Sequence, residues 1–157
     1  MNPGLTRLFL LGAVCFLPAC ATTSSGPVAI TKVNPYHLNT FVPVRTQDDM
    51  IRLEQQRLLY GAVDSEERRD RFGNYFTIFW KTKTRNPSIV RLEYRQGNTG
   101  FTTHVQEVEV GKPKSSNTTK FEVTGDDYHK NGKVTQWKAS IVENGTVVAE
   151  YQSYLWQ

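Results

Sequence analysis

From Phe72 to the C-terminus, apolar and polar residues alternate with a period of two. In the clearest run, Phe76, Ile78 and Trp80 are separated by Thr77 and Phe79, and similar runs follow at residues 90–95, 119–123, 136–141 and 147–155. Successive side chains of a β-strand point to opposite faces, so this pattern predicts half-buried antiparallel strands.

Residues typical of turns separate these runs. Breakers occur at residues 86–87, 96–100, 111–113 and 125–127, and Asn144-Gly145 between two alternating runs is a strong hairpin signal. We also expect a strand within residues 101–110, although its two faces are mixed. Six or more strands with frequent turns favour a β-sandwich over residues 72–157.

The apolar phase of each run defines the expected core. The chain contains 3 tryptophans, 7 tyrosines and 8 phenylalanines, which is ample for a packed interior. The side chains predicted to lie inside are Phe76, Ile78, Trp80, Leu92, Tyr94, Phe121, Trp137, Ile141 and Tyr151.

The runs FTIFWK (residues 76–81) and VRLEYR (residues 90–95) resemble the second and third strands of fibronectin type III domains, which carry a core Trp and then a Tyr-rich strand. The resemblance implies a mainly β, immunoglobulin-like antiparallel sandwich and no particular binding residue. In that topology the two strands belong to opposite sheets. The outward basic residues would then form no single patch; they are Lys81, Lys83, Arg91 and Arg95.

Residues 28–71 are predicted to be an N-terminal extension with one short helix that precedes the sandwich. Pro27, Pro35 and Pro43 exclude a long helix at its start, so we expect extended chain there, with an edge strand as the alternative.

The helix is expected over residues 47–59, with Thr46 as its N-cap; a strand over residues 58–63 is the alternative. The charged stretch DSEERRDR at residues 64–71 is interpreted as a solvated turn or short helix, with a docking patch as the functional alternative.

The first residues of the chain have the features of an export signal. Arg7 is the only charged residue before Lys32, and Leu8–Ala19 is a short, mostly apolar run. This run is too short for a membrane-spanning helix, which needs about 20 residues. A basic residue, a short apolar run and a small-residue site together are typical of a secretory signal.

The run ends in Leu17-Pro18-Ala19-Cys20, which resembles the lipobox of bacterial lipoproteins. The resemblance implies that residues 1–19 are removed and that Cys20 carries a diacylglyceryl thioether and an amide-linked acyl chain such as palmitate. Three acyl chains anchor a protein stably, since stable anchoring takes two lipid signals. A plain secretory signal cut elsewhere is the alternative.

Ala21 follows Cys20, and in lipoproteins of bacteria with two membranes this implies the periplasmic face of the outer membrane. The inner membrane and the cell surface are the alternatives. Residues 20–27 are small and uncharged and are expected to form a flexible tether. Cys15 lies in the removed segment, so the mature chain would have no free thiol for a disulfide or for catalysis.

No familiar catalytic, phosphate-binding or metal-binding motif is present. His37, His104 and His129 are widely spaced, which argues against zinc, and no cofactor is expected. Asp126-Asp127 with His129 is interpreted as a polar turn, with a loose Ca²⁺ or hydrolytic site as the alternative. The formal charge of +4 is too small to indicate nucleic acid.

Two pairs of residues remain as candidates for function. Glu107 and Glu109 share one face of a predicted strand, and such carboxylates are more often solvated than catalytic. Tyr154 and Trp156 share one face near the C-terminus. They either pack under the N-terminal helix or form an exposed patch for a partner.

The sequence therefore predicts a membrane-anchored lipoprotein that is not an enzyme and that presents a surface to another envelope protein. The alternative is a small enzyme or a carbohydrate-binding module that acts on envelope glycans. A cleft in which carboxylates such as Glu107 or Glu109 lie beside exposed aromatic rings would favour this alternative.

Overall fold

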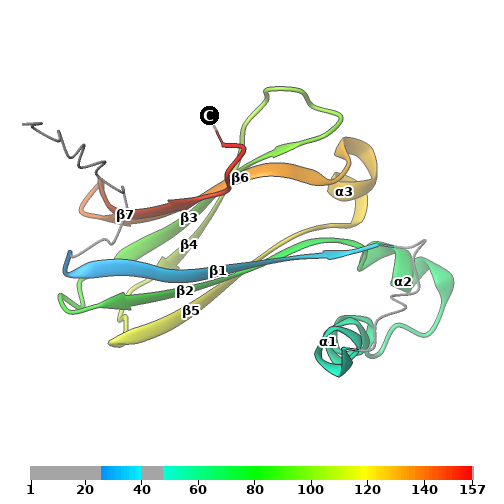
Figure 1. The fold of residues 1–157 in the computed structure, drawn as a ribbon, viewed down its shortest axis with the longest axis horizontal. Helices are drawn as coiled ribbons and strands as arrows, with labels where there is room; N and C mark the ends of the chain where they lie inside the picture. Colours follow the sequence, from blue (N-terminus) through cyan, green and yellow to red (C-terminus); the bar gives the residue numbers. More distant parts are fainter. Residues whose placement is uncertain (1–25, 40–47, 157) are drawn as a thin grey trace, which may run out of the picture.

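The computed structural model describes residues 26–39 and 48–156, and in this part of the chain seven antiparallel strands form two facing sheets (Figure 1). The strand order is β1-β2-β5 in the first sheet and β4-β3-β6-β7 in the second. The strands are β1 (Val28–Leu38), β2 (Gly73–Thr82), β3 (Ser88–Gln96), β4 (His104–Val110), β5 (Ser116–Thr124), β6 (Val134–Glu143) and β7 (Thr146–Gln152). The predicted antiparallel β-sandwich is confirmed.

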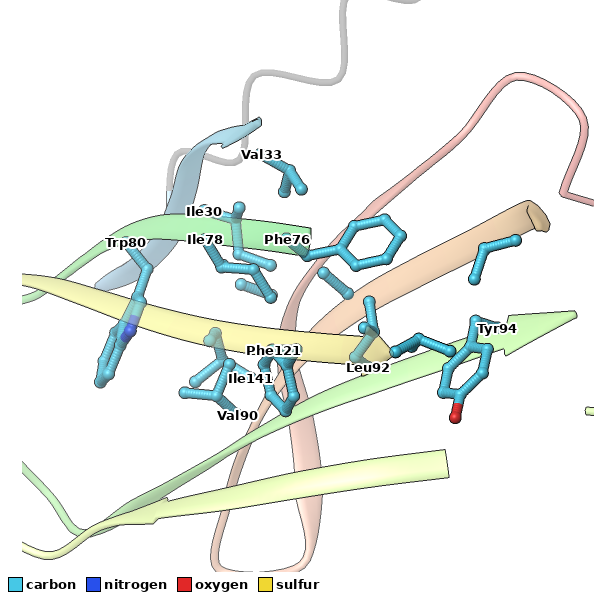
Figure 2. Packing of buried hydrophobic residues seen from close by; sticks show 14 of the residues in the cluster. Ile30, Val33, Phe76, Ile78, Trp80, Val90, Leu92, Tyr94, Phe121 and Ile141 are labelled. Carbon is cyan, nitrogen blue, oxygen red and sulfur yellow. The ribbon is translucent and has the colours of Figure 1, made fainter. Parts of the chain in front are cut away.

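The core lies between the two sheets, which both direct apolar side chains into it (Figure 2). Trp80 is fully buried, and its indole Nε1 donates a hydrogen bond to Thr119 Oγ1 at 3.1 Å on the neighbouring strand β5. Seven of the nine side chains predicted to lie inside are buried: Phe76, Ile78, Trp80, Leu92, Tyr94, Phe121 and Ile141.

The other two predicted core residues are less buried. Trp137 is half-buried and packs edge-on against Phe76, with ring centroids 5.8 Å apart. The prediction for Tyr151 was wrong, because this residue is 47% exposed. It belongs to β7, the last strand of its sheet, where a side chain has a neighbouring strand on one side only.

Strand β1 belongs to the sandwich, although the sequence analysis placed it in an N-terminal extension. It pairs along its whole length with β2, where Ile30 lies opposite Trp80 and Val33 opposite Ile78. Val28, Ile30 and Val33 are buried in the common core. The edge strand named as an alternative is therefore what forms, and the sandwich begins before Phe72.

Helices α1 (Asp49–Leu59) and α2 (Ser65–Asp70) lie between β1 and β2 in the sequence, so the helical segment is an insertion after the first strand. Helix α1 begins after Asp48, whose side chain accepts a hydrogen bond from the Met50 amide at 2.9 Å. The expected N-cap Thr46 lies outside the described residues. Figure 1 shows α1 on the side of the first sheet that faces away from the second sheet.

A third short helix, α3 (Gly125–Asn131), occupies the β5–β6 connection, where the sequence analysis expected a turn. It begins at Gly125 with φ 59° and is followed by Gly132 with φ 82°, two left-handed conformations that favour glycine. Gly125 and Gly132 therefore mark the two ends of a single helical segment.

Candidate functional site

The chain turns back at the end of β7 and carries Tyr154 and Trp156 onto the second sheet. The Ser153 amide donates to the Trp137 carbonyl at 2.9 Å, and the Trp137 amide donates to Ser153 Oγ at 3.1 Å. This pair of hydrogen bonds fixes where the C-terminal residues leave β7.

Beyond this turn, Trp156 and Tyr154 have different environments. The Trp156 ring is half-buried and lies 4.7 Å from the Arg95 guanidinium and 5.4 Å from the Lys138 ammonium, so it is held by two cation–π contacts. Tyr154 is 98% exposed. Trp156 therefore anchors the segment, and Tyr154 projects into solvent.

The β3–β4 loop lies beside this segment (Figure 1). Arg95 connects the two, because its Nε also donates to Thr103 Oγ1 in the loop at 3.3 Å. Phe101 in the same loop is 87% exposed, and Leu155 is also exposed. We call Phe101, Tyr154, Leu155 and Trp156 the C-terminal surface.

The alternative that the aromatic C-terminus packs under the N-terminal helix is wrong. Helix α1 lies beyond the first sheet, whereas the C-terminal surface is attached to the second (Figure 1). The almost complete exposure of Tyr154 agrees with this.

Within the described residues, His37 and His129 both lie against the Tyr128 ring, with centroids 5.7 and 5.3 Å from it, whereas His104 contacts a different tyrosine. His37 Nε2 is 2.8 Å from the Tyr128 hydroxyl, and the His104 ring stacks on Tyr94 with centroids 5.4 Å apart. His129 Nε2 is 3.0 Å from the Arg69 carbonyl oxygen. Residues 26–39 and 48–156 contain no group of three or more His, Cys, Asp or Glu side chains placed to hold a metal ion.

Asp127 joins α3 to the sandwich. It accepts hydrogen bonds from the Tyr94 hydroxyl at 3.3 Å and from Asn131 Nδ2 at 2.6 Å. Burial, together with the nearby Asp127 carboxylate, raises the pKa of Tyr94 to about 12. Since both oxygens of Asp127 serve these contacts, the Asp126-Asp127-His129 segment supports the local fold.

Glu107 and Glu109 do not share a cleft. Glu107 Oε1 accepts from Arg91 Nε on the neighbouring strand at 2.6 Å, and both partners remain open to solvent. Glu109 borders a separate shallow groove of about 320 Å³ between β4 and the β6–β7 turn. The outward basic residues divide between the two sheets, with Lys81 on β2 and Arg91 and Arg95 on β3, so they form no single patch.

A cavity of about 570 Å³ lies between α1 and the outer face of the first sheet. We call it the α1 groove. Aromatic rings line its floor together with Asn34, Thr77 and Thr118, and charged side chains lie at its border. The residues used below are Tyr36, Tyr75, Phe79, Glu54, Arg57, Lys120 and Glu122.

Sequence reasoning assigned no role to the α1 groove. One signal was present, because Tyr75 and Phe79 fall in the outward phase of the β2 run, where polar residues are usual. The position of α1 over these two residues depends on the tertiary structure, so the alternation of residues in the sequence could not predict it.

The buried Glu143 was also missed. Its carboxylate accepts hydrogen bonds from Thr84 Oγ1 at 3.1 Å, from Ser88 Oγ at 3.2 Å and from Asn86 Nδ2 at 3.4 Å. This network ties the β2–β3 connection to the end of β6, so it joins the two sheets at one end of the sandwich.

Comparisons with known proteins provide no functional assignment, because no protein-family model, curated protein or solved structure has a significant match to this chain. None of the helices in the described ranges has the length and apolar character that a membrane span requires.

Proposed function

We propose that this chain is a lipid-anchored protein of the bacterial envelope that works without catalysis and binds another envelope protein through the C-terminal surface. The single observation that carries the binding proposal is the group of exposed side chains around Tyr154, held in place by the Trp156 contacts with Arg95 and Lys138. Large exposed apolar groups that a fold holds in fixed positions are typical of protein–protein contact sites.

The strand that leads into this surface supports the choice of a protein partner. Strand β7 is an edge of its sheet, and its sequence TVVAEYQ contains no proline or lysine, the residues that usually protect an edge from further pairing. Val147 and Tyr151 on this strand are exposed. Strand β1 of the other sheet packs close to β7, so a partner that contacts Tyr154 would meet the exposed side chains of β7 rather than a fully open strand edge.

The fibronectin type III-like assignment belongs to this proposal as well. Trp80 and Tyr94, which lie in the two runs that carry the resemblance, face one common core from opposite sheets. This arrangement supports an immunoglobulin-like module, a class that often presents loops and edges to partners.

The anchor at Cys20 and the location at the periplasmic face of the outer membrane rest on the sequence, since Cys20 lies outside the described residues. Cys20→Ser removes the acylated sulfur, so unprocessed precursor should accumulate and radiolabelled palmitate should no longer be incorporated. A variant that matures and fractionates with membranes as before would contradict the lipid anchor.

Site-specific photo-crosslinking tests the binding surface. A photoreactive residue replaces Tyr154 or Phe101 in the full chain, and a matched control replaces Tyr60, which is 85% exposed but lies beside α1. We expect positions 154 and 101 to crosslink to the same protein and position 60 not to reach it. Equal crosslinking from all three positions, or different products from 154 and 101, would contradict a defined surface.

A further inference from the structure

The floor of the α1 groove lies on the outer face of the first sheet and carries three aromatic rings, with Asn34, Thr77 and Thr118 between and beside them. Tyr36 of β1 lies directly opposite Tyr75 of β2 in the strand register, and Phe79 follows four residues later on the same face of β2. All three are half-buried. Directly paired residues have Cβ atoms about 5 Å apart, whereas four residues along a strand span about 13 Å. The floor therefore offers two aromatic platforms in one line.

The border of the groove carries balanced charge. Lys120 and Glu122 project from β5, and Glu54 and Arg57 come from α1. Arg57 Nε donates to Glu54 Oε2 at 2.9 Å, so these two form a pair within the helix. The side chains of Lys120 and Glu122 are exposed, and each faces an opposite charge on α1: Lys120 interacts electrostatically with Glu54, and Glu122 with Arg57. Two carboxylates and two cations give the border no net charge.

The tyrosines of the floor remain neutral over the physiological pH range. Burial, and secondarily the Glu54 carboxylate, raises the pKa of Tyr36. Burial and Glu122 raise the pKa of Tyr75 to about 12. The floor therefore presents uncharged rings, and the Tyr75 hydroxyl already donates to the Arg71 carbonyl at 2.5 Å.

This combination suits one class of ligand, and we propose that the α1 groove binds an uncharged oligosaccharide chain. One face of a pyranose ring consists of C–H groups and packs against an aromatic ring. Its hydroxyls both donate to carboxylates and accept from ammonium or guanidinium groups, so they match Lys120 and Glu122 together.

Other ligand classes fit less well. A strongly charged polymer would not be attracted to the groove, because the charges at its border cancel. An acyl chain cannot form hydrogen bonds with the charged border, and covering Lys120 and Glu122 without such bonds is costly. A peptide strand cannot add to the floor by backbone pairing, because the groove lies over a sheet face and not along a sheet edge.

The dimensions indicate a short chain of sugars. The groove volume of about 570 Å³ lies within the range of about 300–1,000 Å³ that is usual for small-ligand sites. The separation of the two platforms exceeds one ring, so we expect two or three linked rings to bind better than a monosaccharide. The proposal does not depend on the C-terminal surface.

Calorimetric titration of the purified full chain tests the proposal, in a detergent without a sugar headgroup. The probes are chitotriose, cellotriose, the monosaccharide N-acetylglucosamine and a short heparin fragment as the anionic arm. We expect at least one neutral trimer to bind with a Kd below about 1 mM, and the monosaccharide and heparin fragment to bind at least about tenfold more weakly.

Three variants locate the binding. Tyr36→Leu keeps apolar bulk but removes an aromatic face. Glu122→Gln changes an exposed side chain that the fold does not need. Each variant should lower the affinity for the trimer about tenfold. The matched control Tyr60→Leu changes an exposed tyrosine that does not line the groove and should leave the affinity unchanged. Thermal unfolding of each variant separates lost binding from lost folding.

Three results would overturn the proposal. The first is the absence of saturable binding by either neutral trimer at millimolar concentration. The second is equal or tighter binding of the heparin fragment or the monosaccharide. The third is a trimer affinity that both Tyr36→Leu and Glu122→Gln leave unchanged, because the sugar would then occupy another part of the molecule.

Discussion

The interior of the sandwich and helix α1 are held by different interactions. Between the sheets, side chains such as Trp80, Ile78 and Leu92 are completely buried. No residue of α1 is buried, and Met50 on its surface is 72% exposed. The hydrophobic effect scales with the apolar area removed from water, so the stability of the fold comes from the sandwich, and α1 adds little to it.

Hydrogen bonds from one arginine hold the end of α1 in place. Arg71, next to the start of β2, donates through Nη1 to the carbonyls of Leu58 at 3.1 Å and Tyr60 at 2.5 Å. Ligand-binding elements are commonly drawn from the less stable parts of a fold. The two sheets therefore provide most of the stability of the fold. Helix α1, which forms one wall of the α1 groove, is the less stable element and can change its position.

The largest expected effect comes from truncating the centre of the core. Trp80→Ala should lower the free energy of unfolding by about 3–5 kcal/mol, because it leaves a cavity and removes the bond to Thr119. The matched change Leu53→Ala on the exposed side of α1 should stay within about 0.5 kcal/mol. Denaturant titration measures both, and similar losses at the two positions would remove the contrast.

The next effect concerns the connection between the sheets at Glu143. Glu143→Ala removes the carboxylate that accepts from Thr84, Ser88 and Asn86 and should cost about 1–3 kcal/mol. Glu143→Gln keeps the shape and one acceptor oxygen, so its cost should be smaller. If both variants unfold at the wild-type denaturant concentration, the network does not hold the sheets together.

Two tyrosines should make the stability of the fold depend on pH: Tyr94 in the core and Tyr75 in the α1 groove. The pKa values of Tyr94 and Tyr75 are both raised from 10.0 to about 12. A raised pKa in the folded state favours the neutral phenol, so the contribution is complete below pH 10.0 and is lost as the pH rises from 10.0 to about 12.

Stability should therefore fall within this alkaline window, and Tyr94→Phe and Tyr75→Phe should each flatten the fall. Phenolate absorbance during an alkaline titration measures the two pKa values, with Tyr154→Phe as the exposed control. Titration of all tyrosines near pH 10.0 would contradict the burial of Tyr94 and Tyr75.

The smallest effect on global stability is expected for Arg71→Ala. This change removes the bonds to Leu58 and Tyr60, so α1 should open more often while the sandwich stays folded. The change in the free energy of unfolding should be about 0.5 kcal/mol or less. Circular dichroism during denaturation, compared with tryptophan fluorescence, would show a loss of helix before the main transition. A single coincident transition at a lower denaturant concentration would make α1 part of the cooperative unit.

Periodicity predicted β2, β3 and β5 best, because each of them contributes one face to the core in regular alternation. Strand β1 escaped a firm assignment for a physical reason. The strand has an irregularity between Ile30 and Lys32, so the buried residues Ile30 and Val33 are an odd number of positions apart. Pro35 also argues against a strand, because proline has no backbone N–H to donate. The sheet tolerates it because β1 is an edge strand.

The candidate sites were predictable to different degrees. Tyr154 and Trp156 were found because they follow the last strand in a fixed phase, but the pairing of Trp156 with Arg95 and Lys138 depends on strands distant in sequence. The α1 groove needs three strands and an inserted helix in one place. No local pattern encodes such an arrangement. The sequence analysis therefore selected Glu107 and Glu109 as candidate carboxylates, whereas Glu122 is the one on a strand of the first sheet that lines the groove.

Native-state hydrogen exchange tests the contrast between the sandwich and α1 most directly. The amides of α1 should exchange through local opening, with rates almost independent of low denaturant concentrations, while amides of β2, β3 and β6 should exchange only through global unfolding. Trp80→Ala should then speed exchange in the strands and leave α1 unchanged. If α1 amides are as strongly protected as those of β2 and respond equally to Trp80→Ala, helix and sandwich form one unit and the account is wrong.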